Sequence, residues 1–377
     1  MTGPLASFTE ALEYNTDMCL ERINADGGIY IEAYDKKLPL KVVYADSESN
    51  ASTASEVATK LIQENKVDII IGTVTPDNTS PVSAVAEKFQ VPCLVTDAPY
   101  ESWATAEYEW SYAVMFSVED MVNNYVEALD KVDSNKKVGY LFDSDVDGIT
   151  FSETMRPLLE SHGYTIVDPG RFPSDTTDFT PIISQLKAAG CDIICANQLM
   201  PNFMTAWNQF SQMSYVPKAM LIGKAILFGS DVAALGEGKG EGLLTEIHWH
   251  RTFPYTSSLL GMTAEEIASA YEETKGSQYP LSEFGYDIAT YEILQQALSN
   301  CKDLEPETIL NAISAVDYEG IYGHLAFNGT HVMKCPIVTA QWVKSDVWDY
   351  EPVIIGVGRF SEIEAHEPII IPTTTQK

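Results

Sequence analysis

The stretch Met1–Ile29, MTGPLASFTEALEYNTDMCLERINADGGI, opens with a polar Thr-Gly-Pro turn, continues as an amphipathic helix and ends in Asn-Ala-Asp-Gly-Gly. Its apolar side chains recur close to the 3.6-residue period of a helix with one buried face, at Phe8, Ala11, Leu12, Cys19 and Ile23. Gly27 and Gly28 can adopt the left-handed conformation that closes a helix. We expect a strand directly before this helix.

Length and charge narrow the class of protein. The chain has 377 residues, more than one ordinary compact domain holds, so two lobes are expected. Its formal charge of −31 repels nucleic acid and anionic membrane surfaces, and neither is an expected partner. No apolar run approaches the roughly 18 residues that span a bilayer. Cys191 and Cys195 flank an apolar strand, which indicates buried thiols rather than a zinc site.

Short apolar runs alternate with helical patterns along most of the chain, which is typical of βαβ units and doubly wound parallel sheets. The predicted strands are Leu40–Ala45, Val67–Ile71, Val91–Val95, Val138–Phe142, Thr165–Val167, Asp192–Ala196 and Ala219–Ile222. The predicted helices between them are Ala54–Glu64, Ser80–Phe89, Met121–Lys131, Ser152–His162 and Phe179–Ala189.

The last third of the chain has a different pattern. It predicts helices over Ala264–Lys275 and Tyr286–Ser299, and strands over Gly323–Ala326, Ile337–Lys344 and Val353–Val357. The tail from Ser361 to Lys377 contains two prolines and a threonine run, and we expect it to be extended or loose.

The segment Phe142-Asp-Ser-Asp-Val-Asp-Gly-Ile-Thr150 follows a predicted strand and allows several interpretations. The spacing of Asp143, Asp145, Asp147 and Gly148 resembles a calcium loop, but Thr154 occupies the twelfth position. Asp143 and Asp145 also have the position of a phosphatase-like nucleophile pair. The acids can instead cap the next helix, or contact a ligand at the carboxyl end of a strand.

Two further segments carry weaker signals. Glu246, His248 and His250 would share one face of a strand, but no further metal ligand can be named for them. The glycine-rich run Gly236–Gly242 lacks the Gly-Lys-Ser/Thr ending of a phosphate loop and precedes a strand, so it predicts a surface turn. No metal and no cofactor is expected.

Small polar and aromatic residues follow the carboxyl ends of several predicted strands. The segments that follow them are Gly72–Thr79, Thr96–Trp103, Asn197–Pro201 and Gly223-Lys224. Loops that leave the carboxyl ends of neighbouring parallel strands converge on one cleft, which is the common architecture of a ligand site in open α/β sheets.

The order of these motifs resembles the leucine/isoleucine/valine-binding group of type I periplasmic solute-binding proteins of ABC transporters. The resemblance covers roughly residues 1–360 and rests on seven segments: Thr2–Phe8, Ile23–Ile29, Asp46-Ser47, Ile71-Gly72, Lys137–Asp143, Asp178–Ile183 and Gly285–Ala289.

The resemblance implies an α/β fold with two Rossmann-like lobes joined by three hinge crossovers. The crossovers would lie near Phe116–Val118, Trp249–Arg251 and Leu325–Asn328. Lobe 1 would then comprise residues 1–117 and 250–325, and lobe 2 residues 118–249 and 326–360, followed by the tail. It further implies a non-enzymatic, monomeric protein outside the cytoplasm that closes around a small ligand and delivers it to an ABC permease.

By the same resemblance, the ligand-binding positions are Phe8, Thr75, Pro76, Asp97, Ala98, Tyr100, Trp103, Asp147, Gln198, Leu199, Lys224 and Phe284. Several depart from the pattern of amino-acid-binding members. Pro76 replaces a serine and has no N–H to donate, and Lys224 lies where an acid would hold a ligand ammonium. A lysine at that position favours an anionic ligand, so we expect a carboxylate, aromatic or amino-acid-like. Asp147 would bind a ligand hydroxyl or amine, or pair with Lys224.

Two alternatives remain open: an Asp143/Asp145-dependent phosphotransferase or hydrolase, and a ligand-sensing domain of a receptor. The resemblance also places a central first strand directly before Met1. Its loss would expose the edges of its neighbours. Either the chain as given omits this strand and an export signal, or another segment such as Pro368–Pro372 takes its place; we favour omission.

Overall fold

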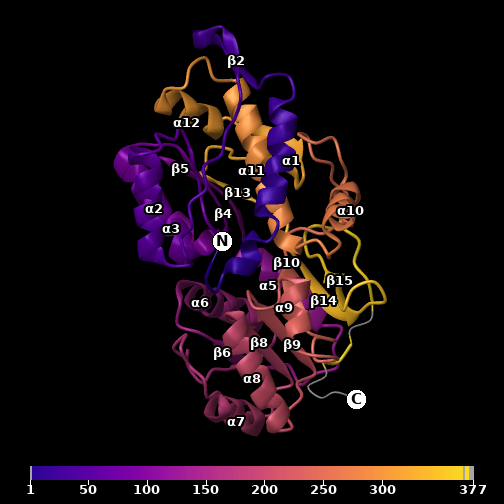
Figure 1. Cartoon of the computed structure of the whole chain (residues 1–377). Coiled ribbons are helices and arrows are strands. Elements are labelled where there is room, and N and C mark those ends of the chain that lie inside the picture. Colours follow the sequence, from indigo (N-terminus) through magenta and orange to yellow (C-terminus); the bar gives the residue numbers. More distant parts are fainter. Residues whose placement is uncertain (1, 368–369, 373–377) are drawn as a thin grey trace. The chain divides into compact units, whose positions relative to one another are not determined.

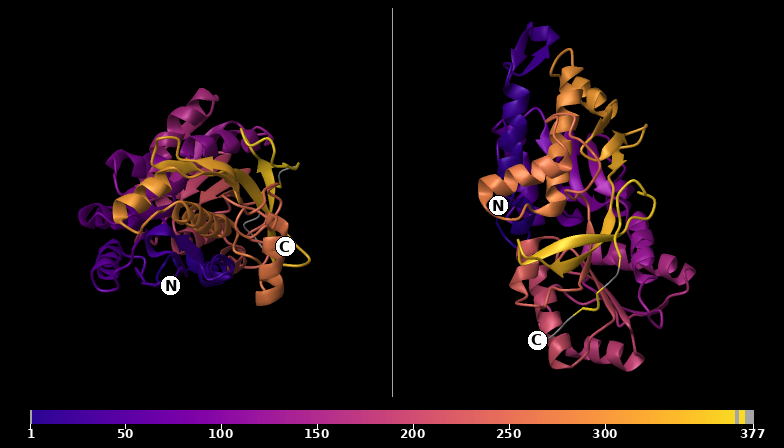
Figure 2. Two further views of the ribbon diagram at one scale, coloured as in Figure 1. Left: turned by 90° about the horizontal axis from the view of Figure 1, so that it is seen from above. Right: turned by 90° about the vertical axis from the view of Figure 1, so that its right-hand side faces the viewer.

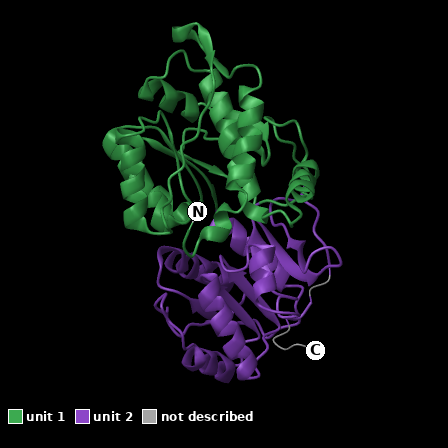
Figure 3. Ribbon diagram, viewed as in Figure 1, with its two compact units in different colours: residues 1–116, 249–336 green, residues 117–248, 337–377 purple. Residues whose placement is uncertain are grey.

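The computed structural model of the chain describes residues 2–367 and 370–372. They form two compact units, each made of two separate stretches of chain (Figure 3). Unit 1 comprises residues 1–116 and 249–336, and unit 2 comprises residues 117–248 and 337–377. The third boundary therefore follows Pro336 instead of lying near Leu325–Asn328, because β13 (Val332–Lys334) still pairs with a strand of unit 1.

Unit 2 is built on a seven-stranded sheet in the order β15-β14-β10-β9-β8-β6-β7. The strands β6 to β10 run parallel, and β14 and β15 continue the sheet as an antiparallel hairpin, drawn in yellow in Figure 2. Every residue of β8, β9 and β10 is buried, as expected for apolar strands covered on both faces. The strands are β6 (Lys137–Phe142), β7 (Thr165–Val167), β8 (Ile193–Asn197), β9 (Ala219–Gly223), β10 (Leu244–Ile247), β14 (Val338–Lys344) and β15 (Tyr350–Gly356).

Five α-helices accompany this sheet: α5 (Val118–Leu129), α6 (Val146–Ser161), α7 (Thr180–Ala189), α8 (Met200–Gln212) and α9 (Gly229–Ala234). Polar side chains fix where two of them begin. Ser117 accepts a hydrogen bond from the backbone N–H of Asp120 at the start of α5. Asp145 accepts one from Gly148 at the start of α6. The described part of the tail packs on the same unit, since the Ile370 N–H donates to Gln341. The tail is therefore not loose over its described residues.

Unit 1 has a smaller parallel sheet of four strands in the order β13-β5-β4-β3. Its strands are β3 (Ile70–Ile71), β4 (Cys93–Pro99), β5 (Ser111–Phe116) and β13 (Val332–Lys334). Two hairpins lie outside this sheet: β1 (Ile29–Ile31) with β2 (Lys36–Leu38), and β11 (Asp317–Gly320) with β12 (Gly323–Ala326).

The helices of unit 1 are α1 (Leu12–Asn24), α2 (Ala51–Gln63), α3 (Pro76–Phe89), α4 (Tyr100–Trp103), α10 (Ala264–Lys275), α11 (Leu281–Ser299) and α12 (Pro306–Ser314), with short 3₁₀ turns at Ala6–Thr9, Glu32–Tyr34 and Ala104–Ala106. Helix α11 is buried on nearly all sides and packs against α1, α12 and β4 (Figure 1). Polar bonds join it to α1: Asn15 donates to Asp287, and the hydroxyls of Thr16 and Tyr291 lie 3.0 Å apart.

Two predicted strands of unit 1 differ from the structure. Leu40–Ala45 has no regular secondary structure and belongs to no sheet among the described residues, and Val67–Ile71 shortens to the two residues of β3. Conversely, β5 was not predicted, although its sequence SYAVMF is fully buried. A strand forms only where a neighbouring backbone pairs with it, and this depends on the rest of the sheet.

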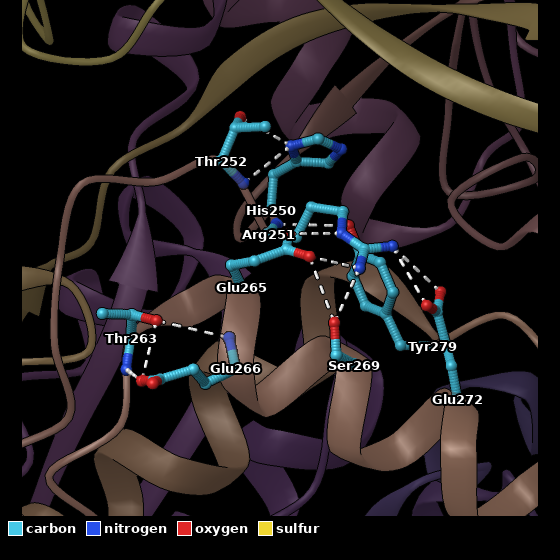
Figure 4. Close-up of polar contacts among 9 residues, drawn as sticks. All are labelled: His250, Arg251, Thr252, Thr263, Glu265, Glu266, Ser269, Glu272 and Tyr279. Atoms are coloured by element: carbon cyan, nitrogen blue, oxygen red, sulfur yellow. Dashed lines mark hydrogen bonds and ion pairs between the residues drawn. The ribbon is translucent and has the colours of Figure 1, made fainter.

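Arg251 holds the start of the second stretch of unit 1 against α10 (Figure 4). Its guanidinium donates to Glu265, Ser269 and Glu272 over 2.6 to 3.2 Å, and its backbone N–H donates to the Tyr279 hydroxyl. Helix α10 itself begins with a capping box between Thr263 and Glu266. Residue 251 therefore lies in a fixed position relative to α10.

Candidate functional site

Three parallel strands of unit 2 end side by side, and the residues after them form a buried polar cluster. Lys224 follows the last residue of β9, and Asp143 follows the last residue of β6. Gln198 follows the last residue of β8, which lies between those two strands. The carboxyl edge of a parallel sheet is where open α/β folds bind ligands. The cluster of Asp143, Asp145, Asp147 and Lys224 is called the lysine cluster below.

The Lys224 ammonium lies between two carboxylates of one helix. Its Nζ donates to Oδ2 of Asp145 at 2.5 Å and to Oδ2 of Asp147 at 3.0 Å. The Lys224 side chain is only 6% exposed, and those of Asp145 and Asp147 are 18% and 7% exposed. Asp145 also caps α6, and its spacing from Asp147 brings both acids to the first turn of that helix. The motif after Phe142 therefore forms a helix cap and an ion pair together.

Glu246 and Tyr125 hold the backbone of Lys224 in place. The residue has a left-handed backbone (φ 68°), and its N–H donates to Oε1 of Glu246 on β10. The Tyr125 hydroxyl of α5 donates to the other oxygen of that carboxylate at 2.6 Å. Burial raises the pKa of Glu246, and the Tyr125 hydrogen bond opposes this. Glu246 is thus a support for Lys224 rather than a metal ligand beside His248 and His250.

The carboxyls of the lysine cluster differ in protonation. Burial, followed by the neighbouring Asp145 carboxyl, raises the pKa of Asp143 to about 8. For Asp145, burial acts to raise the pKa, but Lys224, the neighbouring Asp143 and the hydrogen bond from the Gly148 N–H lower it overall. Burial also acts against the charged form of Lys224, but the three acids raise its pKa overall. Asp143 therefore keeps its proton at neutral pH, and Lys224 stays charged.

This geometry changes the interpretation of Lys224. The sequence alone suggested a free cation that favours an anionic ligand. In the structure, two of its three possible donated hydrogen bonds go to acids of its own unit. Of the two outcomes expected for Asp147, pairing with Lys224 is confirmed. Lys224 therefore gives no reason to prefer a ligand that lacks an amine.

Gln198 and Leu199 complete the candidate residues of unit 2. Gln198 is fully buried, and both polar atoms of its side-chain amide lack a hydrogen-bond partner among the described residues. A buried amide without partners is costly, which marks it as a group that can bind a ligand. Leu199 precedes α8 as its N-cap residue, with an extended backbone.

In unit 1, Thr75 and Pro76 begin α3. Thr75 has a left-handed φ of 63°, its N–H donates to the Asp97 carbonyl, and its own carbonyl accepts from Thr79. Pro76 occupies the first turn, where no N–H is required. The sheet thereby places the positive end of the α3 dipole beside β4.

Asp97 and Ala98 lie within β4 and are both buried. Asp97 also has a left-handed φ, of 47°, at an irregularity in the pairing of β4 with β5. Glu283 of α11 lies against it: burial first, and then Asp97, raises the pKa of Glu283 well above its usual range. The neutral form of Glu283 is therefore favoured.

The aromatic candidates of unit 1 differ in environment. Trp103 is buried in the core of the unit, and its indole Nε1 donates to Ser83. Phe284 is stacked on Trp249 with ring centroids 5.5 Å apart. Phe8 is also buried. Tyr100 is partly exposed, with the Lys334 ammonium 3.5 Å from its ring centroid. Among the four, Tyr100 is thus the ring that remains partly accessible, whereas Trp103 and Phe284 serve the packing of unit 1.

Helix capping was among the interpretations of the motif after Phe142, and the structure shows Asp145 in that role. Sequence reasoning missed two other groups in these surroundings. Tyr125 and Glu283 carry no local signal, because they reach their partners from helices distant in sequence. Within residues 2–367 and 370–372, no group of three or more His, Cys, Asp or Glu side chains is arranged to hold a metal ion, and no helix is long and apolar enough to cross a membrane.

The comparisons with known proteins agree on one family. The family model for periplasmic binding proteins matches residues 1–346. The Leu/Ile/Val-binding protein homolog 7 of Brucella suis is 24% identical over 331 residues, which are 84% of this chain and 79% of that protein. Homolog 8 of Brucella abortus is 23% identical over 333 residues, 84% of this chain and 78% of that protein.

Solved structures show the same fold. The substrate-binding protein LivJ of Streptococcus pneumoniae, in complex with isoleucine, has a TM-score of 0.78 and 21% identity, and covers 94% of this chain and 97% of its own. A solute-binding protein of Rhodopseudomonas palustris, in complex with p-hydroxybenzoic acid, has a TM-score of 0.75 and 18% identity over 95% of each chain. The two parallel sheets, the polar residues at their carboxyl ends and the match over residues 1–346 lead to one conclusion: the chain belongs to the periplasmic binding protein family.

Proposed function

We propose that this protein binds a small amino-acid-like molecule, with a carboxylate and an amine, outside the cytoplasm and delivers it to the permease of an ABC importer. The role of carrier is inferred from the family. The class of ligand is inferred from relatives that are named as leucine/isoleucine/valine-binding protein homologs. The enzyme alternative has no support in these findings. Asp143 is fully buried and Asp145 is engaged as a helix cap, so neither has the environment of an accessible nucleophile.

The lysine cluster is the observation on which the ligand class depends. One lysine faces Asp145 and Asp147, with the protonated Asp143 behind them. Two carboxylates against one ammonium leave an excess of negative charge at the carboxyl edge of the sheet in unit 2. A ligand amine satisfies this excess, whereas a ligand with only a carboxylate is repelled by it. The buried Gln198 amide adds a donor and an acceptor for the same ligand.

Unit 1, taken by itself, contains a place that favours a carboxylate. The start of α3 combines the positive end of a 14-residue helix with the Thr75 hydroxyl. Anions are stabilised at such a terminus by about 0.3–1 kcal/mol. Tyr100 supplies a partly accessible ring for apolar contact with the ligand. These features support a ligand with one acidic end, one basic end and an apolar side chain.

Thermal-shift measurements with matched ligand pairs test this proposal. Leucine is compared with 4-methylpentanoate, and phenylalanine with 3-phenylpropanoate, so that only the amine differs; 4-hydroxybenzoate serves as an aromatic acid. A ligand at about 100 times its Kd stabilises the folded state by about 2.7 kcal/mol. We expect a shift with at least one amino acid and none with its deaminated partner. A shift with the deaminated acids alone overturns the proposal.

A charge variant of the lysine cluster sharpens the test. Asp147→Asn removes one carboxylate. We expect it to weaken binding of the amino acid more than binding of its deaminated partner, since only the amino acid carries an amine. Asp175→Asn is the matched control, because Asp175 is an exposed acid of the same unit. Equal losses of affinity for both ligands would show that Asp147 contributes to folding and does not contact the ligand amine. Light scattering with and without ligand tests the further expectation of a monomer.

A further inference from the structure

We propose that Lys334, the last residue of β13, is the cation of unit 1 that binds the carboxylate of the amino-acid-like ligand, with the Tyr100 ring beneath its ammonium. The inference rests on the proposed function, since it assigns one residue to the acidic end of that ligand. It gives Lys334 the role that the sequence suggested for Lys224, whose ammonium is already paired with two acids.

Lys334 lies at the carboxyl edge of the sheet of unit 1. The strands β13, β5 and β4 run parallel and lie side by side in that order (Figure 1). Lys334 is paired with Met115, which is one residue before the end of β5. Tyr100 directly follows the last residue of β4. Both Lys334 and Tyr100 therefore lie at the edge where open parallel sheets bind ligands.

The alternation of side chains along β13 directs the Lys334 side chain toward the face of the sheet that α3 covers. Side chains two residues apart in a strand lie on the same face, so Lys334 shares a face with Val332. Val332 packs against a core cluster that includes Val82 of α3 and Trp103, and Tyr100 packs against the same cluster. The Lys334 ammonium reaches over the Tyr100 ring, 3.5 Å from its centroid.

The charge of Lys334 is not neutralised within the described chain. Its side chain is exposed, and among residues 2–367 and 370–372 it makes no ion pair and no hydrogen bond. An aromatic ring attracts a cation through its quadrupole but carries no net charge of its own. The segments that follow β3 and β4, residues 72–79 and 100–106, contain no lysine or arginine. Lys334 therefore supplies the positive charge of this edge.

The start of α3 and Lys334 lie on two sides of the end of β4. The Thr75 N–H at the start of α3 donates to the Asp97 carbonyl of β4, and Trp103 of α4 donates to Ser83 of α3. Strand β4 lies between β3, which leads into α3, and β5. A carboxylate at the end of β4 thus has a helix terminus on one side and an ammonium on the other.

The chemistry of the pair suits a carboxylate. An ammonium forms charge-assisted hydrogen bonds with a carboxylate that are about twice as strong as bonds between neutral groups. The face of the Tyr100 ring attracts the Lys334 ammonium, and the edge of the ring, which is partly positive, accommodates an anion. Unit 1 thereby favours the acidic end of the ligand, as the lysine cluster of unit 2 favours the basic end.

Binding of matched probes to Lys334→Met tests the inference. Methionine keeps the unbranched stem of the lysine but removes its charge. Leucine is compared with leucinamide, and phenylalanine with phenylalaninamide, so that only the carboxylate differs. Calorimetry should show that the variant binds the amino acid about tenfold or more weakly. Binding of the amide should change little, and Lys334→Arg should retain most of the affinity for the amino acid.

Lys275→Met is the matched control. Lys275 is also an exposed lysine of unit 1 whose ammonium lies over a tyrosine ring, that of Tyr14, but it belongs to α10 and not to the edge of the sheet. We expect this variant to bind all four probes as the wild type does. Equal Tm values for the wild type and both variants, without ligand, would show that neither substitution acts through folding.

The outcomes separate the inference from the proposed function. If the wild type binds an amino acid and Lys334→Met binds it equally well, the inference fails and the proposed function stands. Equal losses of affinity for the amino acid and its amide also overturn the inference. If only the deaminated 4-methylpentanoate or 3-phenylpropanoate binds, the proposed function fails, and the inference holds only if Lys334→Met weakens that acid. Absence of binding by every probe overturns both.

Discussion

Unit 1 and unit 2 use the same alternation of strands and helices, but their sheets differ. In unit 2, β8 has a partner on each side and all its residues are buried. In unit 1, β3 has one partner, two residues and an exposed isoleucine. The local sequences VDIII and CDIIC that lead into these two strands are almost alike. The formation of a buried parallel strand thus depends on its two neighbouring strands as much as on its own residues.

The units also differ in how they accommodate buried acids. Unit 2 pairs Asp145 and Asp147 with Lys224. Unit 1 keeps Glu283 and Asp287 on α11, where burial raises the pKa of Asp287 to about 7 and only the Asn15 amide opposes it. Asp145 and Asp147 of unit 2 thus face a cation, whereas burial favours the neutral forms of Glu283 and Asp287 in unit 1.

The largest effect is expected from Lys224→Met. It leaves Asp145 and Asp147 buried without their cation, and removal of one partner of a buried ion pair costs about 3–5 kcal/mol. Unfolding by denaturant at neutral pH measures the loss. Lys239→Met, which removes a lysine bonded to the neutral Asn208, is the control. If both variants lose the same amount, Lys224 is not the cation that stabilises these acids.

Matched truncations compare the two sheets directly. Ile194→Ala, in the fully buried β8, should cost about 2–5 kcal/mol. Ile71→Ala, at the open edge of β3, should cost about 0.5 kcal/mol, since the side chain is already partly solvated. Denaturant unfolding gives both values. Equal losses of stability for the two variants would show that Ile71 is packed as closely as Ile194.

The pH dependence of stability should differ in wild type and in Asp287→Asn. The folded pKa of Asp287, about 7, is higher than its usual 3.8, so the folded state binds the proton more tightly than the unfolded state. Its contribution to stability is complete below the usual value and is lost as the pH rises through 7. The asparagine cannot ionise, so the variant should gain stability relative to wild type as the pH rises from about 4 to 7, with no further gain above about pH 8.

Unfolding at several pH values checks this prediction, and Asp143→Asn provides the counterpart in unit 2. The pKa of Asp143, about 8, extends the corresponding loss of stability up to about pH 8. A difference between variant and wild type that does not change with pH would show that these acids do not titrate as described.

The smallest effect is expected at the surface of unit 1. Lys60 and Glu56 pair on one face of α2, and both side chains are more than half exposed. Lys60→Ala should lower stability only slightly, and this loss of stability should vanish in high salt. A salt-insensitive loss measured by denaturant unfolding would indicate a packing role for the lysine stem.

The sequence predicted most elements of unit 2 because their signals are local. Thr165–Val167 matches the observed β7, and the predicted Ala219–Ile222 is one residue short of β9. In unit 1, Ala264–Lys275 matches α10, whose signal is equally local. Errors arose where structure depends on distant partners, as at residues 40–45 and at Ser111–Phe116. The candidate site followed the same rule. The position of Lys224 after a strand was visible, but its pairing with Asp145 and its support from Glu246 and Tyr125 were not.

The six cysteines, all free and buried, have a practical consequence. Cys19, Cys93, Cys301 and Cys335 belong to unit 1, and Cys191 and Cys195 to unit 2. Burial raises the pKa of the Cys93 thiol to about 12, which suppresses reaction with alkylating reagents in the folded state. Peptide mapping after brief alkylation would therefore show which unit opens first as denaturant rises. The chain carries an unfolding reporter in each half, without any added label.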